Sequence, residues 1–255
     1  MAARDLCLTR RIEEGPLHAL ADLDLTVARG EILSLIGPSG CGKTAFLRLV
    51  AGLERPSSGS LEVEGATPEA ARRARLRGLV PAESELQPHR SVGDNVLFGL
   101  DVLGEDAEAR RRRVDEGLAL TGLDGFEGLR LDSLSPGLRR RVAIARALAP
   151  GPRLLLLDDP FLGLDEFVRE ALVLRLRSLR RRAGLTVILT TTSIPESVHA
   201  GDRVAAMAGH PGRILEVIDV PLPETRPPEM RESDAFAAVA RQVRTALAAG
   251  PIPEG

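Results

Sequence analysis

The chain has 255 residues, of which 44% are hydrophobic, so it can bury the core of one α/β domain with an insertion or of two small domains sharing a core. Its formal net charge of −2 argues against a dedicated nucleic-acid binder, which usually carries a basic excess. Arginine-rich runs at 110–113, 139–141 and 180–182 alternate with acidic stretches, and we interpret them mainly as solvated helix faces.

Cysteine use and hydropathy bear on the compartment. The two cysteines, Cys7 and Cys41, do not make a disulfide framework, so we expect a reducing compartment. The first six residues lack the apolar core of a signal peptide, and no run approaches the roughly 20 apolar residues needed to span a bilayer. We therefore expect any membrane role to come through a partner.

The first third of the chain reads as β-rich, because apolar residues alternate or run continuously between turn residues. The expected elements are strands at 6–9, 20–27 and 31–36, a helix at 43–53 and a strand at 60–63. The strand at 31–36 is nearly continuous apolar, which is typical of a strand covered on both faces.

The rest of the chain is first helical and then alternates between strands and helices. We expect helices at 92–103, 106–121 and 136–149, a strand at 153–157, a helix at 165–182, strands at 185–190, 203–207 and 212–220, a Pro-rich linker at 221–228 and a helix at 233–248. Strands separated by helices predict an α/β fold with a mainly parallel sheet. The division we expect is an α/β core with a β subdomain (1–82 and 151–220), a helical subdomain (83–150) and a linker with a C-terminal helix (221–255).

A glycine-rich loop between the strand at 31–36 and the following helix fulfils the phosphate-loop pattern G-x4-G-K-[ST]. We expect its backbone N–H groups to bind phosphates, Lys43 to reach the β- and γ-phosphates, and the Thr44 hydroxyl to coordinate Mg²⁺. Lys43 is the single lysine among 34 basic residues, as expected where a compact ammonium must enter a phosphate cradle. The expected nucleotide-binding residues are Gly37, Ser39, Gly40, Cys41, Gly42, Lys43, Thr44 and Ala45.

Two further segments carry candidate chemistry. Asp158 and Asp159 end an apolar strand, where Asp158 would hold Mg²⁺ and Asp159 would orient or deprotonate an attacking water; alone, such a pair is often only the polar end of a strand. Ser135, before Pro136 and Gly137, is in any case a good N-cap for a helix that begins with proline. Cys41 is either a small buried residue of the loop or an oxidation-sensitive thiol whose pKa the cradle lowers.

The order of these segments resembles the nucleotide-binding subunit of ATP-binding-cassette (ABC) transporters over nearly the whole chain. The segments 37–43, 90–96, 202–204 and 211–214 are similar to the nitrate/sulfonate/taurine importer branch. The resemblance implies a RecA-like phosphate-loop core with an N-terminal antiparallel β subdomain. It also implies a dimer, homo- or heteromeric, in which ATP lies between one subunit's phosphate loop and Ser135 and Gly137 of the other.

The same resemblance implies how such a subunit works in a transporter. Closure of the dimer on ATP would drive a transmembrane permease fed by an extracytoplasmic solute-binding protein. The helical insertion would dock on the permease near residues 83–95, which would place the chain peripherally on the cytoplasmic face of the membrane.

Several positions depart from the family pattern, and they concern catalysis more than binding. Ala82 stands where the family has a Gln that touches Mg²⁺ and water, Asp159 where it has Glu, and Thr192 where it has a switch His. Pro136 and Leu138 replace a Gly and a Gln or Met of the signature. We therefore expect MgATP to bind and hydrolysis to be slow.

The turn near residue 14 offers no aromatic for stacking adenine, so Ile12 or His18 would have to serve, or base selection is weak. The leading function is an ATP-energised importer subunit, and the alternative is a non-hydrolysing regulatory subunit or the degenerate member of a heterodimer. An unrelated phosphate-loop kinase would leave the Ser135 segment unexplained, and DNA-repair relatives carry long coiled coils that this chain lacks.

Overall fold

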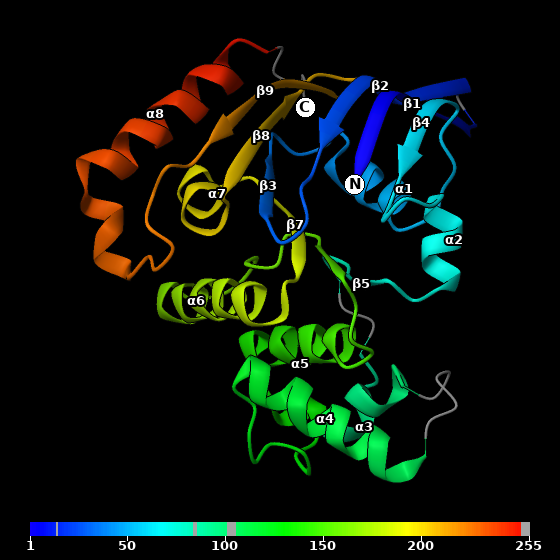
Figure 1. The fold of residues 1–255 in the computed structure, drawn as a ribbon, viewed down its shortest axis with the longest axis vertical. Helices are drawn as coiled ribbons and strands as arrows, with labels where there is room; N and C mark the ends of the chain where they lie inside the picture. Colours follow the sequence, from blue (N-terminus) through cyan, green and yellow to red (C-terminus); the bar gives the residue numbers. More distant parts are fainter. Residues whose placement is uncertain (14, 84–85, 101–105, 251–255) are drawn as a thin grey trace.

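The computed structural model describes residues 1–13, 15–83, 86–100 and 106–250, and within them the strands form two sheets (Figure 1). A three-stranded antiparallel sheet has the order β2-β1-β4, from β1 (Ala2–Ile12), β2 (Gly15–Thr26) and β4 (Ser58–Glu62). The second sheet has six strands in the order β5 (Arg77–Val80), β6 (Leu154–Leu157), β7 (Thr186–Thr191), β3 (Ile32–Ile36), β8 (Arg203–Ala208) and β9 (Arg213–Asp219). All its neighbours are parallel except β8 and β9.

The helices are distributed around these sheets. α3 (Val92–Phe98), α4 (Ala107–Thr121) and α5 (Pro136–Leu148) gather at the end of the molecule away from the three-stranded sheet (Figure 1). The others are α1 (Lys43–Val50), α2 (Pro68–Arg73), α6 (Glu166–Ala183), α7 (Ile194–Ala200) and α8 (Asp234–Ala248). In the part of the chain that the structure describes, no helix has the length and hydropathy to cross a membrane.

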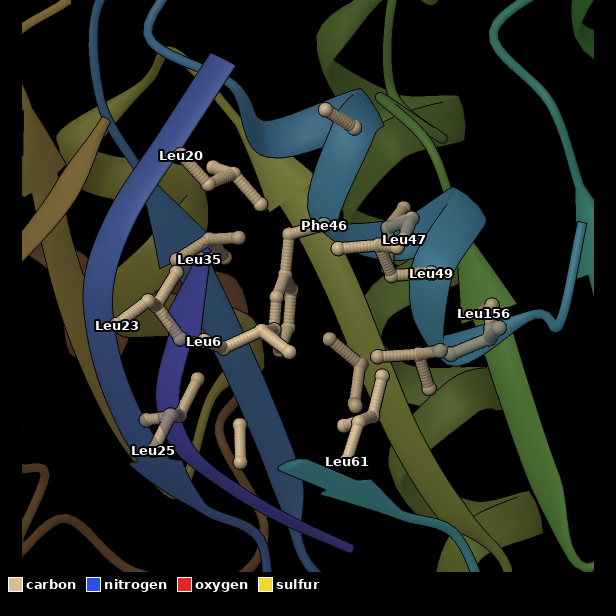
Figure 2. Packing of buried hydrophobic residues seen from close by; sticks show 14 of the residues in the cluster. Leu6, Leu20, Leu23, Leu25, Leu35, Phe46, Leu47, Leu49, Leu61 and Leu156 are labelled. Atoms are coloured by element: carbon tan, nitrogen blue, oxygen red, sulfur yellow. The ribbon is translucent and has the colours of Figure 1, made fainter. Parts of the chain in front are cut away.

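The core that positions the phosphate loop lies on both sides of α1. Phe46 of α1 is fully buried, and Figure 2 shows Leu6 and Leu23 of the three-stranded sheet and Leu35 of β3 pointing toward it. Burying a side chain of this size is worth about 2–3 kcal/mol. Because both sheets contact α1, the start of this helix, at Lys43, is fixed relative to both.

The expected α/β class with a mainly parallel sheet and an antiparallel β subdomain is confirmed, while several boundaries differ. α1 ends at Val50 rather than at 53, and α3 ends at Phe98, followed by turns; residues 101–103 of the expected helix lie outside the described residues. Sequence analysis missed α2, β5 and α7, which have only 6, 4 and 7 residues, too few to show a clear periodicity.

The segment expected as a linker is held to the core by a buried cation. The side chain of Arg226 is almost fully buried and donates to the carbonyls of Val198 at 2.7 Å and Gly201 at 2.6 Å, at the C-terminal end of α7. It also donates to the carbonyls of Val220 and Pro223 at 3.4 and 3.1 Å. Burial lowers its pKa to about 10, so the guanidinium stays charged at neutral pH.

We predict that Arg226→Met lowers the free energy of unfolding by about 3 kcal/mol, because it leaves several buried carbonyls without a donor. Urea denaturation followed by circular dichroism measures the change. The matched control is Arg241→Met, at an exposed arginine of α8, which should change stability by less than about 0.5 kcal/mol. Equal denaturation midpoints for the two variants would contradict a stabilising role of the Arg226 hydrogen bonds.

Candidate functional site

The loop after β3 and the carboxyl ends of β6 and β7 border a cavity of about 340 Å³, as expected where parallel strands end together. Its lining residues are Arg10, Leu17, Ala19, Ser39, Gly40, Gly42, Lys43, Thr44, Ala45, Ala82, Asp158, Asp159, Thr190, Thr192 and His210. The cavity thus brings together the candidate magnesium and catalytic positions and most of the candidate phosphate-loop positions, while Gly37 and Cys41 are not among its lining residues in the described ranges. Ser135 and Gly137 are not among the lining residues in the described part of the chain.

Two glycines of the loop lie too close to neighbouring atoms for a side chain to fit. A Cβ at Gly37 would lie 2.1 Å from the carbonyl oxygen of Met207. Gly42 has φ of +96°, and a Cβ there would lie 2.7 Å from Leu20 Cδ2. Gly42 is also the N-cap of α1 and supplies no side-chain acceptor, so the first-turn N–H groups of α1 remain available for an anion.

Lys43 projects its ammonium into this loop. Nζ donates to the carbonyl oxygens of Gly37 at 2.7 Å and Pro38 at 2.8 Å. Cys41, 3.9 Å from the same ammonium, is fully buried, and burial raises the pKa of its thiol despite the nearby cation. The hypothesis of an oxidation-sensitive Cys41 with a lowered pKa is therefore wrong, and the residue fills space in the loop.

Asp158 is the hydrogen-bonding centre of the cavity floor. Its Oδ2 accepts from the Thr44 hydroxyl at 2.8 Å, and its Oδ1 accepts from the Thr190 hydroxyl at 2.7 Å. A hydroxyl and a carboxylate side by side are hard oxygen donors of the kind Mg²⁺ takes when phosphates and waters complete its shell. The residues present therefore fit a magnesium ion held between Thr44 and Asp158.

Asp159 follows with an unusual backbone. Its φ is +46°, a region that Asp tolerates better than most residues, and its N–H donates to the Thr190 hydroxyl at 2.9 Å. Burial first, and then the charge of Asp158, raise the pKa of this carboxyl, while Lys43 and Arg140 act in the opposite direction. Thr190 therefore positions the Asp158 carboxylate and the backbone of Asp159, a role that sequence analysis did not assign to it.

Ala82 and Thr192 enter the cavity from two other strand ends. Ala82 lies just beyond β5, and Thr192 is exposed just beyond β7. Neither side chain carries a group that is charged at neutral pH. The two positions are thus placed at the site by the fold but bring little chemistry of their own.

Arg140 is the main correction to the sequence analysis, which treated the run at 139–141 as part of a solvated face. Its side chain is buried, with 7% of the residue exposed, and reaches from α5 to the cavity wall. The guanidinium donates to the carbonyls of Pro81 at 2.8 Å, Ala82 at 2.7 Å and Asp159 at 3.4 Å. The signal was present, because Arg140 precedes the buried residues Ile144 and Leu148 by one and two helical turns.

The Ser135 segment lies apart from the cavity and is exposed at its start. Ser135 caps α5, with its hydroxyl accepting from the Leu138 N–H at 3.4 Å, as a structural role requires. A Cβ at Gly137 would lie 3.2 Å from Val168 and 3.4 Å from Leu164, so this turn packs closely on the start of α6.

The residues expected near adenine need revision. Ile12 and His18 are not among the lining residues of the cavity in the described ranges, and His18 instead contacts Thr9 Oγ1 at 3.0 Å through Nδ1. Residue 14 lies outside the described residues. The three-stranded sheet contributes Arg10 and Leu17 of adjacent strands, together with Ala19.

A glycine loop between a buried strand and a helix, with a lysine, a hydroxyl and a strand-end carboxylate around one cavity, defines a phosphate-loop nucleotide-binding protein. The family described as ABC transporter matches residues 20–162, more than half of the chain. The chain belongs to this ATP-binding family.

Curated relatives agree with that assignment. The chain is 41% identical over 202 residues to the taurine import ATP-binding protein TauB of Shigella flexneri, covering 79% of this chain and 78% of the relative. It is 38% identical over 222 residues to the Fe(3+) ions import ATP-binding protein FbpC of Pasteurella multocida, covering 85% of this chain but only 62% of that protein.

Solved structures share the fold. The ATP-binding cassette MJ0796, in a dimeric post-hydrolysis state with ADP and phosphate, matches with a TM-score of 0.76 and 28% identity, over 86% of this chain and 98% of that one. The protein cbiO1 of Clostridium perfringens, part of the complex cbiONQ, matches with a TM-score of 0.77 and 26% identity, over 97% and 95% of the two chains.

We predict that Arg140→Met destabilises the contact between α5 and the cavity wall. The carbonyls of Pro81, Ala82 and Asp159 lose a charged donor. This loss should lower the free energy of unfolding by about 2–4 kcal/mol and speed amide exchange in residues 78–82. Hydrogen exchange by mass spectrometry measures this, with Arg112→Met on an exposed face of α4 as the control. Unchanged exchange at 78–82 would contradict the contact.

Proposed function

We propose that the chain is the ATP-binding subunit of an importer and binds MgATP in the cavity described above. The observation that carries the proposal is the convergence of Lys43, Thr44 and Asp158 on one cavity at a helix N-terminus. Lys43 and the N–H groups of α1 would hold the triphosphate. Thr44 and Asp158 would hold Mg²⁺, which neutralises phosphate charge when bound.

We further propose that hydrolysis is slow. Asp159 would orient the attacking water, but its carboxylate is shorter by one C–C bond than the Glu of the family pattern, and a misplacement of about 1 Å can cost on the order of 100-fold in rate. Ala82 offers no polar side chain toward metal or water, and Thr192 has no cationic form to contact a γ-phosphate. Relative to the family pattern, the residues that would hold phosphate and Mg²⁺ are unchanged, whereas the residues that would act on the γ-phosphate are replaced.

The dimer is the second part of the proposal. ATP would be enclosed between the phosphate loop of one subunit and the exposed turn at Ser135 and Gly137 of another. Two apolar residues near the start of α6 are exposed, Leu162 at 62% and Phe167 at 84%. Gly137 packs against the same part of the chain, so these exposed residues support an interface next to the Ser135 turn. The solved cassette MJ0796, which is similar to this chain, is a dimer bound to ADP and phosphate, and this supports a dimer here.

The permease contact is the third part. We place it on the helical subdomain (83–150) near residues 83–95; residues 84–85 lie outside the described residues. Phe98 is 46% exposed there, with the Arg90 guanidinium 5.5 Å from its ring centre. An aromatic and an arginine at a surface are typical of protein interfaces. The subunit would sit peripherally on the cytoplasmic face of the membrane.

The solute belongs to the proposal as a class. The resemblance to the nitrate/sulfonate/taurine branch and the identity to the taurine import protein favour a small anionic or zwitterionic solute, delivered to the permease by an extracytoplasmic solute-binding protein.

With a reconstituted permease, taurine or nitrate should stimulate turnover and ferric ion should not; stimulation by ferric ion alone would contradict this class.

We predict that the purified subunit binds MgATP but turns it over at less than about 1 per second, below the usual range of enzymes. Asp159→Glu should raise turnover because it restores carboxylate reach, and Asp159→Glu with Ala82→Gln and Thr192→His should raise it further, by about 10-fold or more. Calorimetry and phosphate release on one preparation separate binding from turnover.

The control is Lys43→Ala, which should abolish MgATP binding without unfolding the protein. Turnover of the unaltered protein at rates ordinary for enzymes would contradict slow hydrolysis but leave ATP binding intact. Turnover that stays undetectable in the triple variant, with binding retained, would favour the non-hydrolysing member of a heterodimer.

A further inference from the structure

The wall of the cavity contributed by the three-stranded sheet lacks the aromatic side chain that would pack on a base. The chain contains no Trp or Tyr and six Phe. None of the six lines the cavity in the described part of the chain, and Phe46 and Phe161 are fully buried. A nucleotide base entering this cavity must therefore meet some other flat surface.

We propose that the guanidinium of Arg10 is that surface and stacks on the base, with Leu17 packing beside it. This inference rests on the proposed binding of MgATP. Arg10 and Leu17 are directly opposite each other on β1 and β2, so their side chains share one face of the sheet, and both line the cavity. A planar guanidinium stacks on aromatic faces and nucleobases, which an ammonium cannot do.

The orientation of Arg10 is held by a carboxylate. Its Nε and Nη2 donate to the two oxygens of Glu54, both at 2.9 Å, and Glu54 also accepts from Arg48. These bidentate bonds lie in the guanidinium plane, so they engage its edge and leave its faces for stacking. The Arg10 side chain is 37% exposed, which leaves surface for a ligand to cover.

The same pairing argues that Arg10 does not serve as a phosphate ligand. Glu54 offsets its charge at contact distance, whereas Lys43 carries its charge within the phosphate loop. The imidazole ring of His210 also lines the cavity, but it is exposed and no described contact holds it in place. Arg10 is therefore the flat group that the fold positions in advance.

The test compares two ligands that share the phosphates and differ in the base. MgATP and magnesium tripolyphosphate are titrated by calorimetry into the unaltered protein and into Arg10→Ala, Arg10→Lys, Arg11→Ala and His210→Ala. Arg11→Ala is the matched control, because the exposed neighbour points to the opposite face of β1. Thermal unfolding checks that each variant is folded. If Arg10→Ala is not folded, Arg10→Lys still tests the proposal, because it keeps a cation opposite Glu54.

We expect Arg10→Ala and Arg10→Lys to weaken MgATP binding by about 10-fold, within the range measured for one stacked base, and to leave tripolyphosphate binding within about 2-fold. Equal weakening of both ligands would show that Arg10 acts as a charge and would overturn the proposal. So would full MgATP affinity in Arg10→Lys, or a selective loss in His210→Ala instead. Failure of both ligands to bind the unaltered protein would refute the proposed function itself.

Discussion

The carboxylate of Asp158 is the contact on which the site depends. It joins the first residues of α1, through the Thr44 hydroxyl, to the end of β7, through the Thr190 hydroxyl, while its own backbone directly follows β6. The residue is 93% buried, so an unpaired charge here would cost several kcal/mol. Two donated hydrogen bonds offset that cost and at the same time fix the three elements that border the cavity.

The backbone after Asp158 is constrained by the same bonds. Thr190 accepts from the Asp159 N–H while donating to Asp158, so the turn that carries Asp159 is held at φ of +46°. Aspartate tolerates this region because its short polar side chain can bond locally, and glutamate lacks that advantage. The reach of the carboxylate and the backbone conformation are therefore linked at position 159. A glutamate there would extend further into the cavity, but its backbone would be strained at this φ.

Much of the fold could be predicted because the signals are local. The glycine loop, the apolar strand before it and the aspartates at the end of another apolar strand can each be recognised in one short segment. Arg140 and Arg10 could not be assigned in this way, because their partners Ala82 and Glu54 are 58 and 44 residues away and only the tertiary fold brings them together. β5 was missed for a related reason: its four residues form a strand because they pair with β6, which is distant in the sequence.

The contrast between arginine and lysine in this chain follows from what each cation contacts. Arg140 and Arg226 each reach several carbonyls of different segments, which needs donors spread around a planar group. Lys43 instead places one compact ammonium against two carbonyls of its own loop, where a ligand's oxygens can replace them without moving the backbone. A guanidinium at position 43 would fill the space that phosphates need, whereas an ammonium at 140 or 226 would leave buried acceptors unmet. The single lysine thus lies where a cation must change its hydrogen-bond partners when a ligand binds. The buried arginines lie where the hydrogen-bond partners of a cation must stay the same.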